Sequence, residues 1–190
     1  MAWKWKREIR LQYDTEADGY DELYSQEQNK KYDIAIDHIS AFSAIERTLD
    51  SGCGTGIFLE RVASSVEFAV GIDFSSRALQ EARVRLNRVP NVDLVCADFD
   101  YLPFATGTFS HIFMFTALPA QAHWSLALRE ALRALTDTGT LVLSVPKAEI
   151  SAENLLANLT MNGLEERKLI DQEETPDYVF IGEKANGIAG

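Results

Sequence analysis

From about residue 47 onward, short runs of apolar residues alternate with longer segments in which apolar residues recur at helical spacing. The short runs predict strands over residues 47–50, 66–72, 92–96, 109–115 and 140–145. Residues 66–72 are nearly all apolar, which is typical of a strand covered by helices on both faces of a sheet. The alternation therefore predicts a parallel sheet built from strand–helix–strand units.

Helices are expected over residues 55–64, from Ser75 to the residue before Pro90, and over residues 124–135. The turn residues Asp137-Thr138-Gly139 are expected to close the last of these helices. Ahead of the sheet, residues 18–40 predict one more helix. Its expected apolar residues are Leu23, Tyr24, Ile34, Ile39 and, just beyond it, Phe42.

A final helix is expected after Ser151, followed by strands over residues 164–170 and 178–182. The connection between these strands has no room for a crossover helix, so they should be antiparallel neighbours. The predicted fold class is α/β, with a seven-stranded, mostly parallel sheet whose last strand is antiparallel and with helices on both faces. The 190 residues have the size of one compact domain, with residues 1–45 as a helical cap and residues 46–190 as the α/β part.

Composition narrows the function classes. The chain has 18 Lys and Arg against 29 Asp and Glu, a net charge of −11, which disfavours direct binding to nucleic acid. No apolar run approaches the roughly 20 residues of a membrane span, so no membrane segment is expected. No apolar stretch follows the basic N-terminal residues, so no secretory signal is expected either. The predicted location is therefore cytoplasmic. Cys53 and Cys96 lack the spacing of a metal site or disulfide framework, so both are expected to be reduced, packed thiols and no metal is expected.

The loop after the first predicted strand is rich in glycine, with the sequence Gly52-Cys53-Gly54-Thr55-Gly56. Glycines let the chain approach a ligand closely, and the following helix presents free N–H groups. Asp73 ends the second predicted strand, where a carboxylate can accept the two hydroxyls of a ribose or can cap the helix near Ser75. The dinucleotide fingerprint requires glycine at position 57, where this chain has Ile57, and this disfavours NAD.

Several segments, in order along the chain, resemble class I S-adenosylmethionine-dependent methyltransferases. Residues 49–56 resemble motif I, residues 96–104 resemble a later motif with an acid after the third strand, and residues 109–112 resemble the fourth strand, with Ser110 in place of the usual acid. Residues 128–141 are similar to the helix and fifth strand of this group. Upstream, residues 13–21 are similar to the Tyr-Asp-x-x-Ala-x-x-Tyr-Asp segment that opens many small, type 11-like members.

The resemblance implies a Rossmann-like methyltransferase fold and S-adenosylmethionine as the cofactor, with S-adenosylhomocysteine as its product. Gly52 and Gly54 would lie against the methionine part and Asp73 would hold the ribose. Asp50 would orient the loop or a water near the amino acid end. Phe74 and Phe99 would lie on either side of the adenine, with Asp98 near its amino group. Phe115 and Thr116 would lie beside the methyl group. Tyr13 and Tyr20 would close over the cofactor from the cap, or they would only pack the cap helix.

Methyl transfer from a sulfonium is a direct displacement that an enzyme can promote mainly by positioning and desolvation, so a dedicated base is optional. The candidates for a catalytic role are Thr116 and His123, of which His123 has the alternative role of a helix cap or surface residue. Residues 115–119 lack the Asn/Asp-Pro-Pro-aromatic motif typical of enzymes that methylate exocyclic amines of bases or glutamine. The identity of the catalytic residues therefore stays open.

Three functions are compatible with the sequence. The first is methylation of an O, N or C atom of a small molecule. The second is methylation of tRNA or a translation protein, with a small zinc-binding activator that would pair with the edge strand over residues 92–96. The third is binding of S-adenosylmethionine without catalysis.

Overall fold

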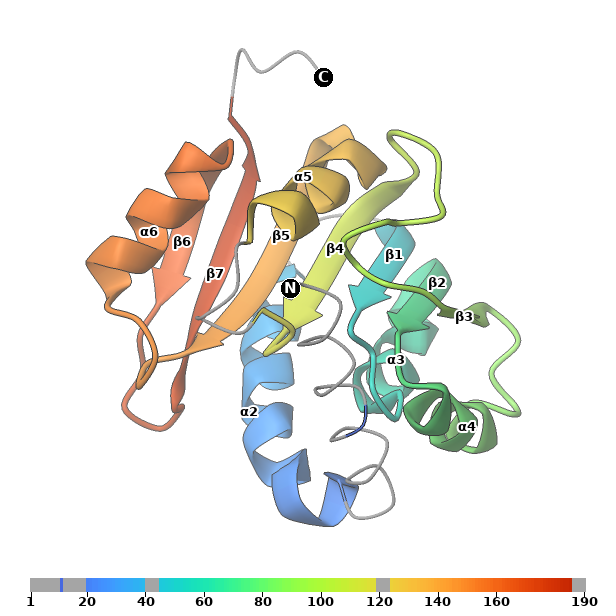
Figure 1. The fold of residues 1–190 in the computed structure, drawn as a ribbon. Coiled ribbons are helices and arrows are strands. Elements are labelled where there is room, and N and C mark those ends of the chain that lie inside the picture. Colours follow the sequence, from blue (N-terminus) through green and yellow to red (C-terminus); the bar gives the residue numbers. More distant parts are fainter. Residues whose placement is uncertain (1–10, 12–19, 40–44, 119–123, 186–190) are drawn as a thin grey trace.

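The computed structural model describes residue 11 and residues 20–39, 45–118 and 124–185. A central sheet is flanked by helices (Figure 1). The strands are β1 (Ile45–Ser51), β2 (Val66–Asp73), β3 (Val92–Cys96), β4 (Phe109–Phe115), β5 (Leu135–Pro146), β6 (Leu164–Ile170) and β7 (Asp177–Lys184). The helical elements are α2 (Tyr20–Ile39), α3 (Ile57–Val62), the short 3-10 helix η2 (Ala63–Ser65), α4 (Ser76–Arg85), α5 (Ser125–Ala134) and α6 (Ala152–Met161).

The seven strands are ordered β3-β2-β1-β4-β5-β7-β6. Strands β1 to β5 pair in parallel, whereas β7 is antiparallel to both of its neighbours, β5 and β6. The order reverses between β1 and β4, because the chain first extends the sheet toward β3 and then returns to build the other half. The mixed seven-stranded sheet and its antiparallel last strand, expected from the short β6–β7 connection, are confirmed.

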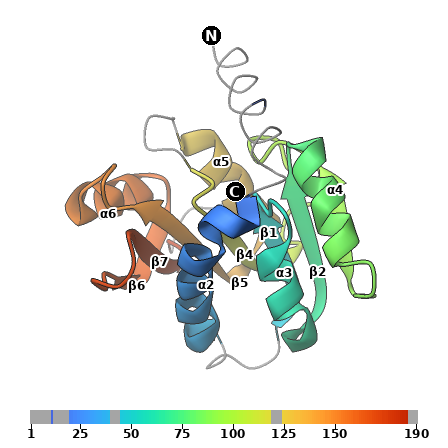
Figure 2. The ribbon, with the colours of Figure 1, turned by 90° about the horizontal axis from the view of Figure 1, so that it is seen from below.

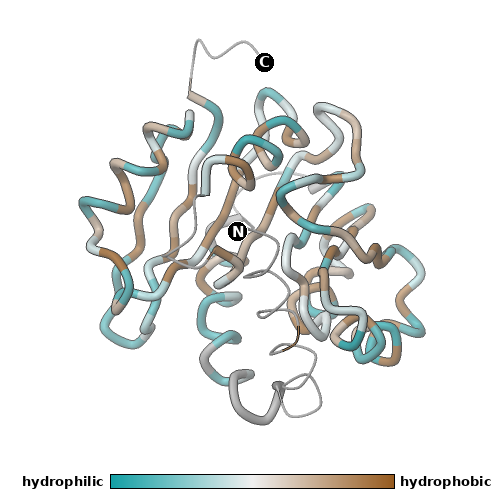
Figure 3. Tube along the Cα trace, in the orientation of Figure 1, coloured by the Kyte–Doolittle hydropathy of each residue, from teal (hydrophilic) through white to brown (hydrophobic). Residues whose placement is uncertain are grey.

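Helices cover both faces of the sheet (Figure 2). Successive residues of β4 alternate between two cores, as side chains of a strand must. Ile112 and Met114 pack in a core with residues of α5 and α6, whereas Phe113 and Phe115 pack in a core with residues of α2, α3 and α4. Hydrophobic residues are accordingly concentrated along the central strands (Figure 3).

The turn expected between the helix and β5 is wrong. Helix α5 ends at Ala134, and Asp137-Thr138-Gly139, expected as a turn, lies inside β5. Phe109 of β4 pairs with Leu135, but His111 pairs with Thr140, so β5 carries extra residues between these two pairs. The turn-forming residues are therefore absorbed as an irregularity in the strand, which is where Gly and Asp are tolerated in a sheet.

The N-terminal helix α2 contacts α3 and β7. Among its described side chains, those of Gln28, Lys31, Tyr32 and Ala35 are buried, and they lie on one helical face. Of the apolar residues expected to pack this segment, Ile34 is half-buried, and the side chains of the others lie outside the described residues. Across the described ranges, no helix is both long and apolar enough to cross a membrane.

Candidate functional site

A pocket opens at the carboxyl ends of β1, β2, β3 and β4, where the strand order reverses and where ligands bind in open α/β sheets. It encloses about 650 Å³, including the part open to solvent. Four chain segments line it: Gly52, Gly54 and Thr55 after β1; Ile72, Asp73, Phe74 and Ala78 around the start of α4; Ala97 and Phe99 after β3; and Phe115, Thr116 and Ala117 after β4.

The glycine loop has two different reasons for its glycines. A Cβ on Gly52 would lie 2.9 Å from the Cβ of Ala117, so Gly52 allows close packing of the loop against the segment after β4. A Cβ on Gly54 would meet no atom within 4 Å, although Gly54 has a φ of +53° that favours glycine. The backbone at Gly54 therefore borders open space in the pocket.

Asp73 joins the loop to the start of α4. One carboxylate oxygen, Oδ2, accepts a hydrogen bond from the Gly54 N–H at 2.9 Å, and Oδ1 accepts one from the Ser75 N–H at 2.8 Å. The cap of α4 is Ser75, whose Oγ accepts from the Ala78 N–H. Asp73 thus supports the residues at the helix start while its carboxylate forms part of the pocket wall.

Phe74 and Phe99 lie at the ends of neighbouring strands and are half-buried in the pocket lining. Asp98, which sequence reasoning placed beside them, is not among the lining residues. Its Oδ1 accepts a hydrogen bond from the Asp100 N–H at 3.0 Å, within the turn that follows β3. The structure therefore brings the two aromatic rings to the pocket and directs Asp98 into a local turn.

Asp50, near the end of β1, is 1% exposed. Burial, and secondarily the negative charge of Asp73, raise its pKa to about 8. Its Oδ2 atom is buried and has no hydrogen-bond partner among the described residues.

Burial and the carboxyl groups of Asp50 and Asp73 also raise the pKa of the neighbouring Cys53 thiol. Cys53 is buried as expected, but the expectation of a packed thiol is wrong for Cys96, which is exposed at the end of the edge strand β3.

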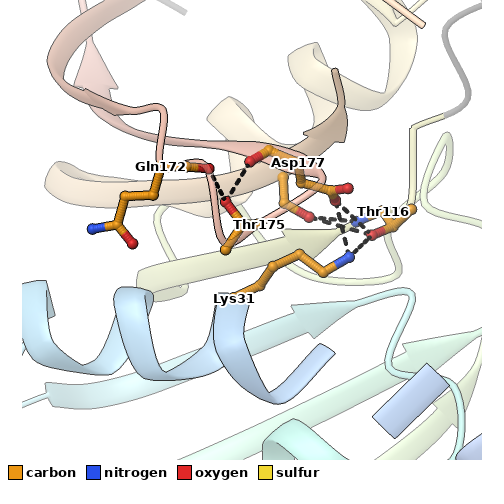
Figure 4. Close-up of polar contacts among 6 residues, drawn as sticks. Lys31, Thr116, Gln172, Thr175 and Asp177 are labelled. Carbon is orange, nitrogen blue, oxygen red and sulfur yellow. Dashed lines mark hydrogen bonds and ion pairs between the residues drawn. The ribbon is translucent and has the colours of Figure 1, made fainter. Parts of the chain in front are cut away.

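Thr116 follows β4 and has a φ of 50°, the one positive φ of a non-glycine residue in the described part of the chain. Its Oγ1 accepts a hydrogen bond from Lys31 Nζ at 2.9 Å and donates one to Asp177 Oδ2 at 3.1 Å. Lys31 and Asp177 themselves form an ion pair at 2.9 Å, so three side chains converge from α2, from the residue after β4 and from β7 (Figure 4).

Sequence reasoning missed Lys31 and Asp177. A lysine in a polar helical segment is usually solvated, and the spacing of Lys31 with Tyr32 and Ala35 was the available sign that it lies on the buried face. Of the predicted site residues, Gly52, Gly54, Asp73, Phe74, Phe99, Phe115 and Thr116 line one pocket. Tyr13 and His123 lie outside the described residues, as does the side chain of Tyr20.

An open, mostly parallel sheet with a glycine-bordered pocket at the reversal of strand order defines a Rossmann-like α/β protein. Residues 49–143, half of the chain, match the family model described as a methyltransferase domain. The chain therefore belongs to the methyltransferase domain family.

Known proteins resemble the chain over different lengths. The malonyl-[acyl-carrier protein] O-methyltransferase of Legionella pneumophila is 36% identical over 107 residues, which are 53% of this chain and 36% of that protein. The 1,6-didemethyltoxoflavin-N1-methyltransferase of Burkholderia thailandensis, solved with 1,6-didemethyltoxoflavin and S-adenosylhomocysteine, is 13% identical with a TM-score of 0.81, covering 98% of this chain and 91% of that chain. A chain from the solved complex of the Haloferax volcanii Trm112 methyltransferase activator with a methyltransferase is 18% identical with a TM-score of 0.73, covering 92% of this chain and 98% of that chain.

At these identities the two solved structures establish the fold alone. The chain spans between 36% and 52% of the length of three curated relatives that it matches.

Proposed function

We propose that the chain binds S-adenosylmethionine in this pocket and transfers its methyl group to an O, N or C atom of a small molecule. The observation that carries the proposal is the wall formed by Gly54 and Asp73. There, open space borders a backbone without a Cβ, and a buried carboxylate lies 2.9 Å from the Gly54 N–H. Membership of the methyltransferase domain family supports the same ligand.

The residues present fit this ligand. Each carboxylate oxygen of Asp73 accepts a backbone N–H, which fixes the group in the pocket wall, and a carboxylate at the end of the second strand of such a sheet can accept the hydroxyls of a ribose. The half-buried rings of Phe74 and Phe99 offer apolar surfaces for a planar base. Asp98, which precedes Phe99, would accept a hydrogen bond from an exocyclic amino group of that base.

The negative charge of Asp73 suits a cationic ligand. Asp50 and Asp73 lie close enough for the charge of one to raise the pKa of the other. Asp50 does not line the pocket, and its buried Oδ2, which has no partner among the described residues, would reach the amino acid end of the ligand only through a bridging water. When bound, S-adenosylmethionine would supply an electrophilic methyl group on a positively charged sulfur. The chain would orient the reactants and exclude water.

A small acceptor is supported by the relatives and by the charge of the chain. Malonyl-[acyl-carrier protein] and 1,6-didemethyltoxoflavin appear in the names of two similar proteins, and a net charge of −11 opposes a polyanionic acceptor. A role for Thr116 or His123 in removing a proton remains part of this proposal. The Thr116 hydroxyl would first have to leave its bonds with Lys31 and Asp177.

One observation favours a second candidate, a macromolecular acceptor reached with an activator protein. Strand β3 ends the sheet on one side, and Val92, Leu94 and Val95 are only half-buried on it. Such an edge can pair with a strand of another protein. Coexpression with a small zinc-binding activator tests this candidate: a stable complex and a gain of activity would support it, and full activity of the isolated chain would count against it.

The main proposal is tested with radiolabelled S-adenosylmethionine and a metabolite extract. We expect label to pass to small acceptors with the wild-type chain and not with Asp73→Ala. Tight binding of S-adenosylhomocysteine without transfer to any extract would instead favour a non-catalytic binding protein. Absence of binding would refute the proposal.

A further inference from the structure

The ion pair between Lys31 and Asp177 is fully inside the protein. The two side chains are 0% and 2% exposed, and their charged atoms are 2.9 Å apart. The other ion pairs among the described residues each retain at least one partly exposed side chain, as in the pair of Arg167 and Glu183 between β6 and β7. The Lys31–Asp177 pair is therefore distinct in its complete removal from water.

Such a pair contributes little net stability, because desolvation of both charges offsets much of their attraction. Good geometry and additional hydrogen bonds reduce that cost, and here the additional partner is Thr116. The Thr116 hydroxyl accepts a hydrogen bond from Lys31 Nζ and donates its own hydrogen to Asp177 Oδ2. Because that hydrogen is used, the Ser144 hydroxyl, 3.3 Å away, is the donor in the third bond to Thr116 Oγ1. The hydroxyl then has its full set of one donated and two accepted bonds.

The backbone of Thr116 is held as firmly as its side chain. The Thr116 N–H is shared between Ser144 Oγ at 3.0 Å and the Ser144 carbonyl oxygen at 3.2 Å. A β-branched residue at a φ of 50° is strained, and such a conformation persists only where the surroundings determine it. On the other side of the pair, the Thr175 hydroxyl donates to the Asp177 carbonyl oxygen at 3.1 Å, so Asp177 is fixed as well (Figure 4).

The consequence for the pocket follows from the neighbours of Thr116. Phe115, Thr116 and Ala117 all line it, and Ala117 lies so close to Gly52 that a Cβ there would be 2.9 Å from the Ala117 Cβ. A shift of Thr116 would therefore displace one pocket wall and its contact with the glycine loop. We propose that Lys31 and Asp177 are positioning residues that hold residues 115–117 in the ligand-binding conformation, an inference that rests on the proposed function.

The test measures S-adenosylhomocysteine affinity by calorimetry. Removing one partner alone would leave a buried charge, so both are replaced together by apolar side chains in Lys31→Met/Asp177→Leu. We expect this double variant to fold and to bind about tenfold or more weakly than the wild type. Thr116→Val, which lacks the hydroxyl, should weaken binding to a similar degree, whereas Thr116→Ser, which keeps it, should stay within about threefold of the wild type.

A control variant that is destabilised away from the pocket separates loss of positioning from general destabilisation. Leu159→Ala removes a buried side chain of α6, which packs on β6 at the far edge of the sheet, and it should bind S-adenosylhomocysteine like the wild type. If the double variant does not fold, the pair Thr116→Val and Thr116→Ser decides. Wild-type affinity in folded Thr116→Val or in the folded double variant would overturn the inference and leave the proposed function intact. Failure of the wild type itself to bind would instead refute the proposed function.

Discussion

Replacement of Asp50 by asparagine should change how the stability of the chain depends on pH. Asp50 is buried at the end of β1, and its pKa in the folded chain is about 8, against an ordinary value of 3.8. Between these two values the unfolded chain has released this proton while the folded chain keeps it. The folded state then binds more protons, so the contribution of Asp50 to stability is fully present below pH 3.8 and is lost as pH rises toward 8.

The expected magnitude follows from the same shift. One proton of difference corresponds to about 1.4 kcal/mol per pH unit, so the wild type should lose about 2.7 kcal/mol between pH 5 and pH 7 relative to Asp50→Asn. Other groups also titrate, including His111, whose pKa burial lowers. His111 is present in both proteins, and its effect therefore cancels in the comparison.

The assay is urea unfolding of both proteins at pH 5, 6 and 7, with the free energy of unfolding extrapolated to water at each pH. The difference in unfolding free energy between variant and wild type should shift in favour of Asp50→Asn at each step. A difference that stays constant within about 0.5 kcal/mol over this range would show that Asp50 is ionised in the folded chain, and the reasoning would be refuted.

Three further predictions concern the pocket and the thiols. Gly54→Ala should weaken S-adenosylhomocysteine binding by about tenfold or more in calorimetry. Gly107 also has a positive φ and open space around it but lies outside the pocket lining, so Gly107→Ala should leave the affinity unchanged. Equal effects of the two substitutions would contradict the assigned site. Asp73→Asn should lower the same affinity about tenfold or more because charge-assisted hydrogen bonds are lost, and an unaltered dissociation constant would exclude Asp73 from the site. Iodoacetamide at pH 8 should modify the exposed Cys96 and spare Cys53, because Cys53 is buried and its pKa is raised. Mass spectrometry counts the modified thiols, and denatured protein serves as the control. Two modified thiols in the folded chain would disprove the burial of Cys53.

The sequence-based predictions were accurate where neighbouring residues determine a feature and failed where pairing with a distant strand determines it. Strands β3, β4 and β6 have the predicted bounds, because apolar residues delimit them clearly. The start of β5 was predicted at Thr140, but the strand begins five residues earlier, at Leu135, because Asp and Gly in a strand irregularity carry the same signal as a turn. Local residue preferences cannot distinguish these two outcomes, which tertiary pairing with β4 decides.

The two sides of the pocket also differ in how far apart along the chain their residues lie. Gly52, Gly54, Asp73 and Phe74 lie within 23 consecutive positions, where a motif read along the chain can find them. The opposite wall depends on contacts between Lys31 and Thr116, 85 positions apart, and between Lys31 and Asp177, 146 positions apart. No local pattern links such residues, since their meeting is a property of the folded sheet. Local motifs can therefore identify the glycine-loop side of the pocket, whereas the wall at residues 115–117 depends on long-range contacts that no motif contains.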